Sequence, residues 1–275
     1  MSRLYFKKVT ISTVAIISTL YLAVCFYYYH NQELIIFPAS KIDLTTEFNF
    51  ELKHKEFFLD TPDGARLNAV LFEAETPKGI VLHFHGNGEN MMHMKYVAEP
   101  FISRNYSLLA MDYRSYGKSS GSLSEESLYS DAALFMQYLE DSGWNPSDII
   151  IYGRSIGTSI AIQLAAQSNP RGVILYSPFY SLKSLVSEIL PFIPVEMILK
   201  FPLESAKYMS EVSSPVLILH GDSDSVIPVS NAEKLSKIKG RLVVLKHGTH
   251  ENLTNYPQFW SEIDDFLSGI IPRNL

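Results

Sequence analysis

The sequence predicts an α/β fold built on a mostly parallel, doubly wound sheet, and three observations lead to this prediction. Residues 51–60 and 66–74 are strand-like runs joined by a Pro-Asp-Gly turn, which is the pattern of an antiparallel hairpin. After residue 79, short apolar runs alternate with longer helical stretches, as strands and helices do in βα units. The first of these runs, Gly79–Phe84, shows no polar–apolar alternation, which indicates a strand covered on both faces.

The remaining elements follow one another as strands and helices along a chain of 275 residues. Apolar runs predict strands at residues 107–113, 148–152, 173–176, 216–220 and 242–245, and helical patterns cover residues 90–104, 125–141, 159–166, 231–238 and 257–267. No internal repeat interrupts this order, and a hydrophobic content of 47% suffices for a substantial core. We therefore predict one domain over residues 51–275.

One insertion separates the strand that ends at Tyr176 from the strand that begins near Pro215. Residues 181–213 are rich in Leu, Ile, Val and Phe, and Pro191 and Pro194 divide them into short helices. Because large exposed apolar patches usually mark a binding surface, we favour a helical lid with an apolar underside facing an acyl chain or the membrane. The alternative is a helical crossover that packs on the edge of the sheet.

The N-terminus carries a stretch that is long and apolar enough to cross a membrane. Arg3, Lys7 and Lys8 precede residues 9–29, which contain no charged residue, and a span needs about 20 largely apolar residues. Three tyrosines, residues 27–29, fit an aromatic belt at the far interface. The positively charged flank stays in the cytoplasm, so the rest of the chain is expected on the periplasmic or lumenal side.

A retained signal-anchor over residues 1–29, followed by a linker over residues 30–50, is the preferred interpretation. A cleaved signal peptide is the first alternative, but no small-x-small site closes the apolar run cleanly. A lipoprotein signal ending at Cys25 is the second, and the valine before this cysteine fits that pattern poorly. Within the linker, Ile35–Pro38 is expected to lie along the membrane or the domain surface.

The composition excludes two further classes of protein. A net charge of −6 gives no basic footprint for nucleic acid. The single cysteine, Cys25, excludes an internal disulfide, so the fold depends on packing. His83 and His85 lie on one predicted strand with no accompanying carboxylate pattern, so we expect neither a metal nor a cofactor.

A G-x-S-x-G pattern, Gly153–Gly157, lies between the predicted strand 148–152 and the predicted helix 159–166. In this position the pattern forms a nucleophile elbow, a sharp turn that holds the serine in a strained conformation with its hydroxyl exposed. A β-carbon at either glycine would crowd the neighbouring strand or helix. A chance match is the alternative, and the strand before and the helix after argue against it. Ser155 is therefore the candidate nucleophile.

A serine nucleophile needs a base to take its proton and an acid to hold that base, in the chain order Ser, Asp or Glu, His. The loop after the predicted strand 216–220 carries two acids. We favour Asp224, because Asp222 follows the turn glycine and could brace the loop. Beyond them the sequence has only two histidines, His247 and His250. We favour His250, which lies deeper in the last loop, because His247 abuts the strand and suits packing.

An acyl-transfer site also needs N–H donors for the oxyanion. One is expected from the backbone of Ile156, directly after the nucleophile, and the other from the loop 85–90 after the third strand. Glycines in this loop let the backbone approach a carbonyl, and Asn87 is the expected donor. The alternative is a plain strand-to-helix turn that His85 braces.

With these pieces assembled, the sequence resembles the α/β-hydrolase family over roughly residues 34–270, and more narrowly its membrane-anchored serine hydrolases with one N-terminal helix and a short lid. The segments that carry the resemblance are His85–Gly88, Asp112–Gly121, Gly153–Gly157, Ser177–Phe179, Pro191–Val195, His220–Asp224 and Gly248–His250. One departure is Ser115, where the family more often has glycine, and it concerns the shape of a loop rather than the triad.

The resemblance implies Ser155 as nucleophile, Asp224 as acid, His250 as base, and Asn87 and Ile156 as oxyanion donors. Because family members include esterases, lipases and acyl-protein thioesterases, the resemblance implies a serine hydrolase of ester or thioester bonds without naming the substrate. The expected partners are a small or lipid-like acyl substrate, an acylated protein included, and the membrane. A peptidase or amidase using the same triad, and a non-catalytic binding protein of this fold, are the alternatives.

Overall fold

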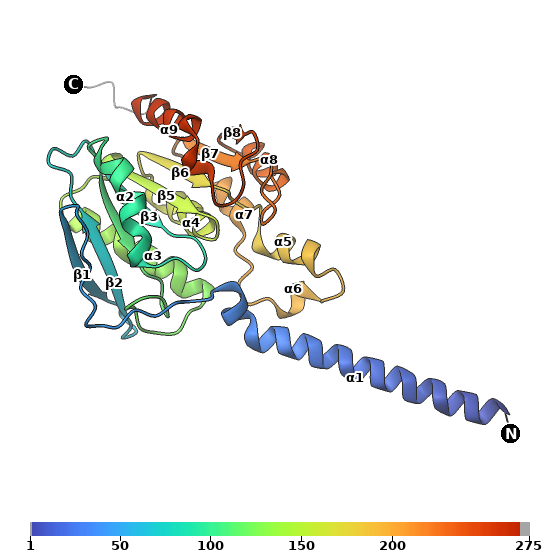
Figure 1. Ribbon diagram of the computed structural model, residues 1–275. Helices are drawn as coiled ribbons and strands as arrows, with labels where there is room; N and C mark the ends of the chain where they lie inside the picture. Colours follow the sequence, from blue (N-terminus) through green and yellow to red (C-terminus); the bar gives the residue numbers. More distant parts are fainter. Residues whose placement is uncertain (1, 270–275) are drawn as a thin grey trace.

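The computed structural model describes residues 2–269 and contains an eight-stranded sheet with helices on both faces (Figure 1). The strand order is β1-β2-β4-β3-β5-β6-β7-β8. The first two pairs in this order are antiparallel, and every later pair is parallel. The predicted mostly parallel, doubly wound sheet is therefore confirmed. Residues 270–275 of the predicted domain lie outside the described residues.

The bounds of the elements follow the apolar runs of the sequence closely. The strands are β1 (His54–Asp60), β2 (Arg66–Phe72), β3 (Ile80–Phe84), β4 (Ser107–Met111), β5 (Ile149–Arg154), β6 (Gly172–Tyr176), β7 (Val216–Gly221) and β8 (Arg241–Leu245). The α-helices are α1 (Ser2–Ile36), α2 (Met94–Ile102), α3 (Glu125–Asp141), α4 (Gly157–Ser168), α5 (Leu182–Ile189), α6 (Val195–Ile198), α7 (Ser205–Met209), α8 (Ser230–Ser236) and α9 (Pro257–Gly269). Short 3₁₀ turns lie at Met91–His93, Pro146–Asp148 and Leu253–Asn255.

The period of two along each strand divides the core into two halves. In β5, Ile149 and Ile151 pack in the core under α3, α4, α7 and α8, whereas Ile150 and Tyr152 pack in the core under α2 and α9. All four side chains are buried, as expected for a parallel strand covered on both faces. This burial leaves the strand ends as the places where the chain can present polar groups to a substrate.

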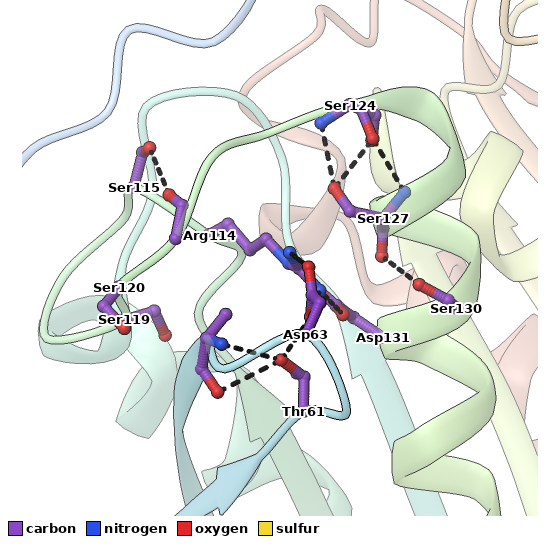
Figure 2. Close-up of polar contacts among 12 residues, drawn as sticks. Thr61, Asp63, Arg114, Ser115, Ser119, Ser120, Ser124, Ser127, Ser130 and Asp131 are labelled. Carbon is purple, nitrogen blue, oxygen red and sulfur yellow. Dashed lines mark hydrogen bonds and ion pairs between the residues drawn. The ribbon is translucent and has the colours of Figure 1, made fainter.

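The hairpin of β1 and β2 is tied to α3 by a buried arginine (Figure 2). The Arg114 guanidinium donates to both carboxylate oxygens of Asp131 on α3 at 2.8 Å. It also donates to Asp63 in the hairpin turn, with Nη2 at 2.9 Å from the carboxylate. The side chains of Arg114 and Asp131 are 6% and 4% exposed, whereas that of Asp63 is 62% exposed. Arg114 thus compensates one buried charge and fixes the turn.

The N-terminal helix α1 is longer than the predicted anchor. It continues to Ile36, so the first part of the predicted linker 30–50 is helical. No glycine or proline interrupts residues 30–36, and Pro38 follows the helix end, which explains where it stops. One described segment, Thr10–Ile36, could cross a membrane by its length and composition. Phe37 then enters the domain, where it is buried against Phe201 with ring centroids 4.9 Å apart.

The insertion 181–213 contains α5, α6 and α7, and α5 and α6 lie beside the C-terminal end of α1 (Figure 1). Its two ends belong to the core through Leu182, Leu185 and Met209. Its middle carries Phe192 and Met197, which are 86% and 84% exposed. The insertion is therefore packed on the domain at its base and exposed at its apolar tip.

Candidate active site

The turn after β5 has the geometry of a nucleophile elbow. Ser155 has a φ of +51°, in the left-handed region that is strained for a residue with a β-carbon. A β-carbon on Gly153 would lie 2.6 Å from the Gly157 carbonyl oxygen, and one on Gly157 would overlap the Phe84 carbonyl oxygen. Both glycines are therefore required by close backbone contacts, and these contacts place the elbow directly against the loop that follows β3.

His250 connects the serine to an acid. Its Nε2 lies 3.0 Å from Ser155 Oγ, and its Nδ1 lies 2.8 Å from Asp224 Oδ2. All three residues are buried, with relative exposures of 7–8%. The three loops that follow β5, β7 and β8 bring these side chains together at one edge of the sheet. This arrangement lets an imidazole accept a serine proton while a carboxylate holds the ring.

The surroundings of Asp224 keep it ionised. Burial alone would raise its pKa, but hydrogen bonds from His220 and His250 and from the backbone N–H of Ile227 hold the pKa well below its usual range. Asp224 Oδ1 accepts from the N–H groups of Val226 and Ile227 at 2.9 and 2.8 Å. One oxygen is thus fixed by the backbone, and the other is left to face His250.

The two competing residues take other positions. Asp222 Oδ1 accepts from the His247 N–H at 2.6 Å and from the Ser223 hydroxyl at 2.9 Å, so it braces the two neighbouring loops. His247 is exposed, and its carbonyl accepts from the Tyr256 hydroxyl at 2.9 Å. Neither side chain is part of the hydrogen-bonded chain that joins Ser155, His250 and Asp224.

The predicted oxyanion donors lie on the two segments that meet at the elbow. Ile156 precedes the first turn of α4, where backbone N–H groups have no partner within the helix. Asn87 is exposed in the loop after β3, and its side-chain oxygen accepts from the Tyr116 hydroxyl at 3.3 Å. His85, in the same loop, is buried against Tyr113 with ring centroids 4.2 Å apart and braces the loop as the alternative interpretation expected.

The structure contains a charged network around the site that the sequence does not predict. Arg154, the variable residue before the nucleophile, forms ion pairs with Glu89 in the loop after β3 and with Glu251 directly after His250. Glu89 in turn accepts from the Gly86 N–H at 2.7 Å. Burial alone would raise the pKa of Glu89, but the Arg154 charge, together with the nearby His85 and His83 and the Gly86 N–H, lowers it. Arg154 therefore links the elbow to the loops that follow β3 and β8.

The sequence gives only a weak signal for this network. Arg154 lies beside the nucleophile, and Glu89 and Glu251 lie in two other loops. Their opposite charges predict ion pairs only if the loops are already known to converge. The Arg154 guanidinium also lies over the Tyr176 ring, 5.2 Å from its centroid. The position of Arg154 is thus determined by three contacts on three different segments.

Two buried histidines and one acid lie behind this loop. His83 and His85 are buried, and His85 Nε2 is 3.8 Å from Asp112 Oδ1. Burial raises the pKa of Asp112 to about 8 and lowers that of His83 to about 3. Within residues 2–269, no group of three or more His, Cys, Asp or Glu side chains is arranged to hold a metal ion.

Known proteins share both the sequence pattern and the fold. The family described as "Serine aminopeptidase, S33" matches residues 75–204, which include the elbow. The mouse protein "Alpha/beta hydrolase domain-containing protein 17C" is 31% identical over 249 residues, which cover 86% of this chain and 76% of that protein. The chain belongs to the α/β-hydrolase family.

Two other known proteins are similar to this chain over most of its length. "Protein bem46" of Schizosaccharomyces pombe is 28% identical over 288 residues, which cover 98% of this chain and 96% of that protein. The solved structure of the Pyrococcus furiosus esterase Pf2001 has a TM-score of 0.65 and 18% identity, covering 85% of this chain and 98% of that one. This structural likeness shows the fold alone. Membership of the family supports hydrolase activity in general terms.

Proposed function

We propose that this chain is a membrane-anchored serine hydrolase that cleaves carboxylic ester or thioester bonds of acyl, lipid-like substrates. The observation that carries the proposal is the chain of two short contacts, 3.0 Å from Ser155 Oγ to His250 Nε2 and 2.8 Å from His250 Nδ1 to Asp224 Oδ2. Nucleophile, base and acid at these distances are the arrangement that activates a serine hydroxyl.

In the proposed mechanism, Ser155 Oγ attacks the acyl carbon while His250 Nε2 takes the hydroxyl proton. The imidazolium that forms is stabilised by the ionised Asp224, whose low pKa keeps it a carboxylate throughout. The backbone N–H groups of Ile156 and Asn87 stabilise the oxyanion. His250 then donates its proton to the leaving alcohol or thiol, and an acyl-enzyme remains. Water, deprotonated by His250, attacks this ester and releases the acid and the free serine.

A fluorophosphonate probe tests the nucleophile directly. We expect the full chain to be labelled on Ser155 and the Ser155→Ala variant to be unlabelled and inactive. Ser159→Ala is the matched control, because Ser159 is also buried and lies one turn further along α4. The control should keep its label. Labelling that persists on the peptide of Ser155→Ala, or undiminished ester hydrolysis by that variant, would contradict the proposal.

A peptidase or amidase is the second candidate, and the match of residues 75–204 to a family described as a serine aminopeptidase supports it. The apolar insertion 181–213 supports an ester or thioester with an acyl chain instead. Parallel assays with acyl esters, acyl thioesters and aminoacyl amides of equal chain length separate the two. A higher kcat/KM for the amide would favour the peptidase. A site that binds these compounds but takes no probe would indicate a binding protein.

The membrane part of the proposal rests on α1. A helix that spans a bilayer stays in the membrane fraction during alkaline carbonate extraction, and the positively charged N-terminal flank supports a domain on the non-cytoplasmic side. Protease treatment of intact and opened vesicles tests the orientation. The domain should be protected in intact vesicles whose cytoplasmic face points outward and cleaved once these vesicles are opened. Cleavage of the domain in the intact vesicles would reverse the assignment. Release of the chain into the supernatant by carbonate would contradict the proposal of a membrane anchor.

A further inference from the structure

An apolar groove lies where the end of α1 meets the insertion 181–213. Its volume is about 190 Å³, and its walls include Tyr28, Ile35 and Ile36 of α1 and Val186, Ile189 and Ile193 of the insertion. Apolar cavities of about 150 Å³ in proteins stay dry and take up small hydrocarbons. We call this feature the anchor–insertion groove. Its size suits a stretch of one hydrocarbon chain.

The groove is held open by a rigid joint between α1 and the insertion. The side-chain amide of Gln32 donates to the Ile198 carbonyl at 2.9 Å and accepts from the Lys200 N–H at 2.6 Å. Gln32 lines the groove but is only 5% exposed, and both ends of its amide are hydrogen-bonded. The Lys200 ammonium also lies over the Tyr29 ring, 4.3 Å from its centroid. The two walls therefore belong to one unit, and the groove presents no unsatisfied polar group from Gln32.

The length of α1 places this groove at a membrane surface. The apolar segment Thr10–Ile36 has 27 residues. At 1.5 Å per residue it measures about 40 Å, whereas the hydrocarbon core of a bilayer is about 30 Å thick. The charged flank before Thr10 lies at one interface, so roughly the last seven residues of the helix reach the headgroup level at the other. The groove, with walls from residues 28–36, lies at this boundary.

The tip of the insertion has the surface expected of a segment that enters lipid. Phe192 and Met197 are 86% and 84% exposed, which makes them the most exposed large apolar side chains outside α1 in the described part of the chain. Ile189, which lines the groove, is 63% exposed. Such residues next to a spanning helix pack favourably at the boundary between headgroups and acyl chains.

We propose that the tip of the insertion inserts into the bilayer beside α1 and that the anchor–insertion groove binds one acyl chain of a bilayer phospholipid. The inference rests on the anchoring proposed above and adds a second membrane contact to it. The consequence is that the domain has a fixed orientation on the membrane, because the Gln32 joint prevents α1 and the insertion from turning independently.

Depth-dependent quenching tests the tip. The full-length chain is reconstituted in phosphatidylcholine vesicles, with or without bromine on the acyl chains, and Phe192→Trp is compared with Tyr96→Trp. Tyr96 is a matched control because it is 68% exposed on α2, which packs on the other face of the sheet. Zwitterionic lipid is chosen because Glu196 and Lys200 flank the tip with opposite charges. The emission of Trp144 and Trp260 in the unaltered chain is subtracted.

We expect brominated lipid to quench at least half of the emission added by Phe192→Trp and almost none of that added by Tyr96→Trp. Equal emission of the Phe192→Trp variant in both lipids would overturn the inference. Carbonate extraction of the same vesicles separates the two proposals. If the chain resists extraction and the tryptophan is not quenched, the anchoring proposal is supported and only the insertion of the tip into the bilayer is refuted.

Photo-crosslinking tests the groove itself. A phosphatidylcholine with a diazirine on its acyl chain should label peptides from both walls, residues 28–36 and 186–198. Val186→Trp should fill the groove and reduce the label on 186–198 severalfold while fluorophosphonate labelling stays unchanged. Label confined to residues 10–27, label that Val186→Trp leaves unchanged, or crosslinks between two copies of the chain would each contradict acyl-chain binding in the groove.

Discussion

Replacement of Arg154 by methionine should weaken both the fold and the active site. The Arg154 side chain is 12% exposed and pairs with Glu89, which is 19% exposed, and with Glu251, which is 73% exposed. Removal of one partner from a buried ion pair costs about 3–5 kcal/mol, whereas an exposed pair contributes about 0–1 kcal/mol. We therefore expect Arg154→Met to lose about 3 kcal/mol of unfolding free energy and Glu251→Gln less than about 1 kcal/mol.

The pH dependence of the unfolding free energy distinguishes the loss of the Arg154 charge from a simple loss of packing. With Arg154 present, the pKa of Glu89 is lowered, so its contribution is present above the unfolded pKa and is lost as the pH falls. In Arg154→Met, burial, the largest single influence on the Glu89 pKa, is opposed only by the Gly86 N–H and the nearby His83 and His85, so we expect this pKa to rise above the unfolded value. The folded state then binds more protons, so the variant should lose stability as the pH rises above the unfolded pKa of Glu89.

The activity follows from the loops that Arg154 connects. Without it, the Gly86 loop and the His250 loop lose their link to the elbow, and a displacement of about 1 Å at a reacting group can lower the rate about 100-fold. We expect Arg154→Met to lower kcat by about this factor with a smaller change in KM, because positioning rather than substrate binding is lost. Arg154→Lys keeps the charge but lacks the fork that pairs with two acids, so it should recover only part of kcat.

Denaturant unfolding and ester hydrolysis, measured on the same detergent-solubilised samples, test these values. The double variant Arg154→Met/Glu89→Gln should regain part of the lost stability, because it leaves no uncompensated charge. The reasoning would be refuted if Arg154→Met retained its stability to within about 0.5 kcal/mol, the usual range of surface substitutions. A variant that kept kcat while losing stability would show that the network supports the fold and not the site.

Three further predictions follow from single contacts. Asp224→Asn should lower kcat by about 10⁴-fold, because the amide favours the wrong imidazole tautomer, while Asp222→Asn, which alters only a loop brace, should lower it less than about 10-fold in the same ester assay. Ser115→Gly should raise the unfolding free energy by about 0.5–1 kcal/mol, since Ser115 has a φ of +68°; a lower melting temperature would contradict this. Arg114→Met should cost about 3 kcal/mol, because it leaves a buried carboxylate on α3 unpaired, whereas Asp63→Asn, at an exposed partner, should cost far less in denaturant unfolding.

The parts of the fold that depend on local periodicity were predictable from the sequence. The apolar run that became β5 and the G-x-S-x-G turn after it indicated a strand, a sharp turn and a helix, and the φ of +51° at Ser155 is the strain that this turn requires. The rule of chain order led from Ser155 to the loops that carry Asp224 and His250. Parallel strands end at one edge of the sheet, so loops that are distant in sequence converge there.

The parts that depend on contacts between distant segments were not predictable. Ser115 stood out in the sequence only as a departure from a family pattern, and its left-handed conformation is evident only in the structure. Arg154 occupies a variable position of the elbow pattern, so nothing in the pattern assigns it a partner. Glu89 and Glu251 lie in two other loops, and each is an ordinary polar loop residue until the fold places it beside Arg154.

The role of Gln32 at the junction of α1 and the insertion is evident in the structure but not in the sequence. The predicted linker begins at residue 30, so the prediction places Gln32 in the linker and assigns it no contact. In the structure the helix continues to Ile36. The Gln32 amide forms hydrogen bonds with the backbone of residues 198 and 200 in place of hydrogen bonds with water. A buried amide with both ends satisfied costs little and specifies one geometry, whereas an unpaired one would be expensive. A residue of the predicted linker is therefore the one that joins α1 to the insertion.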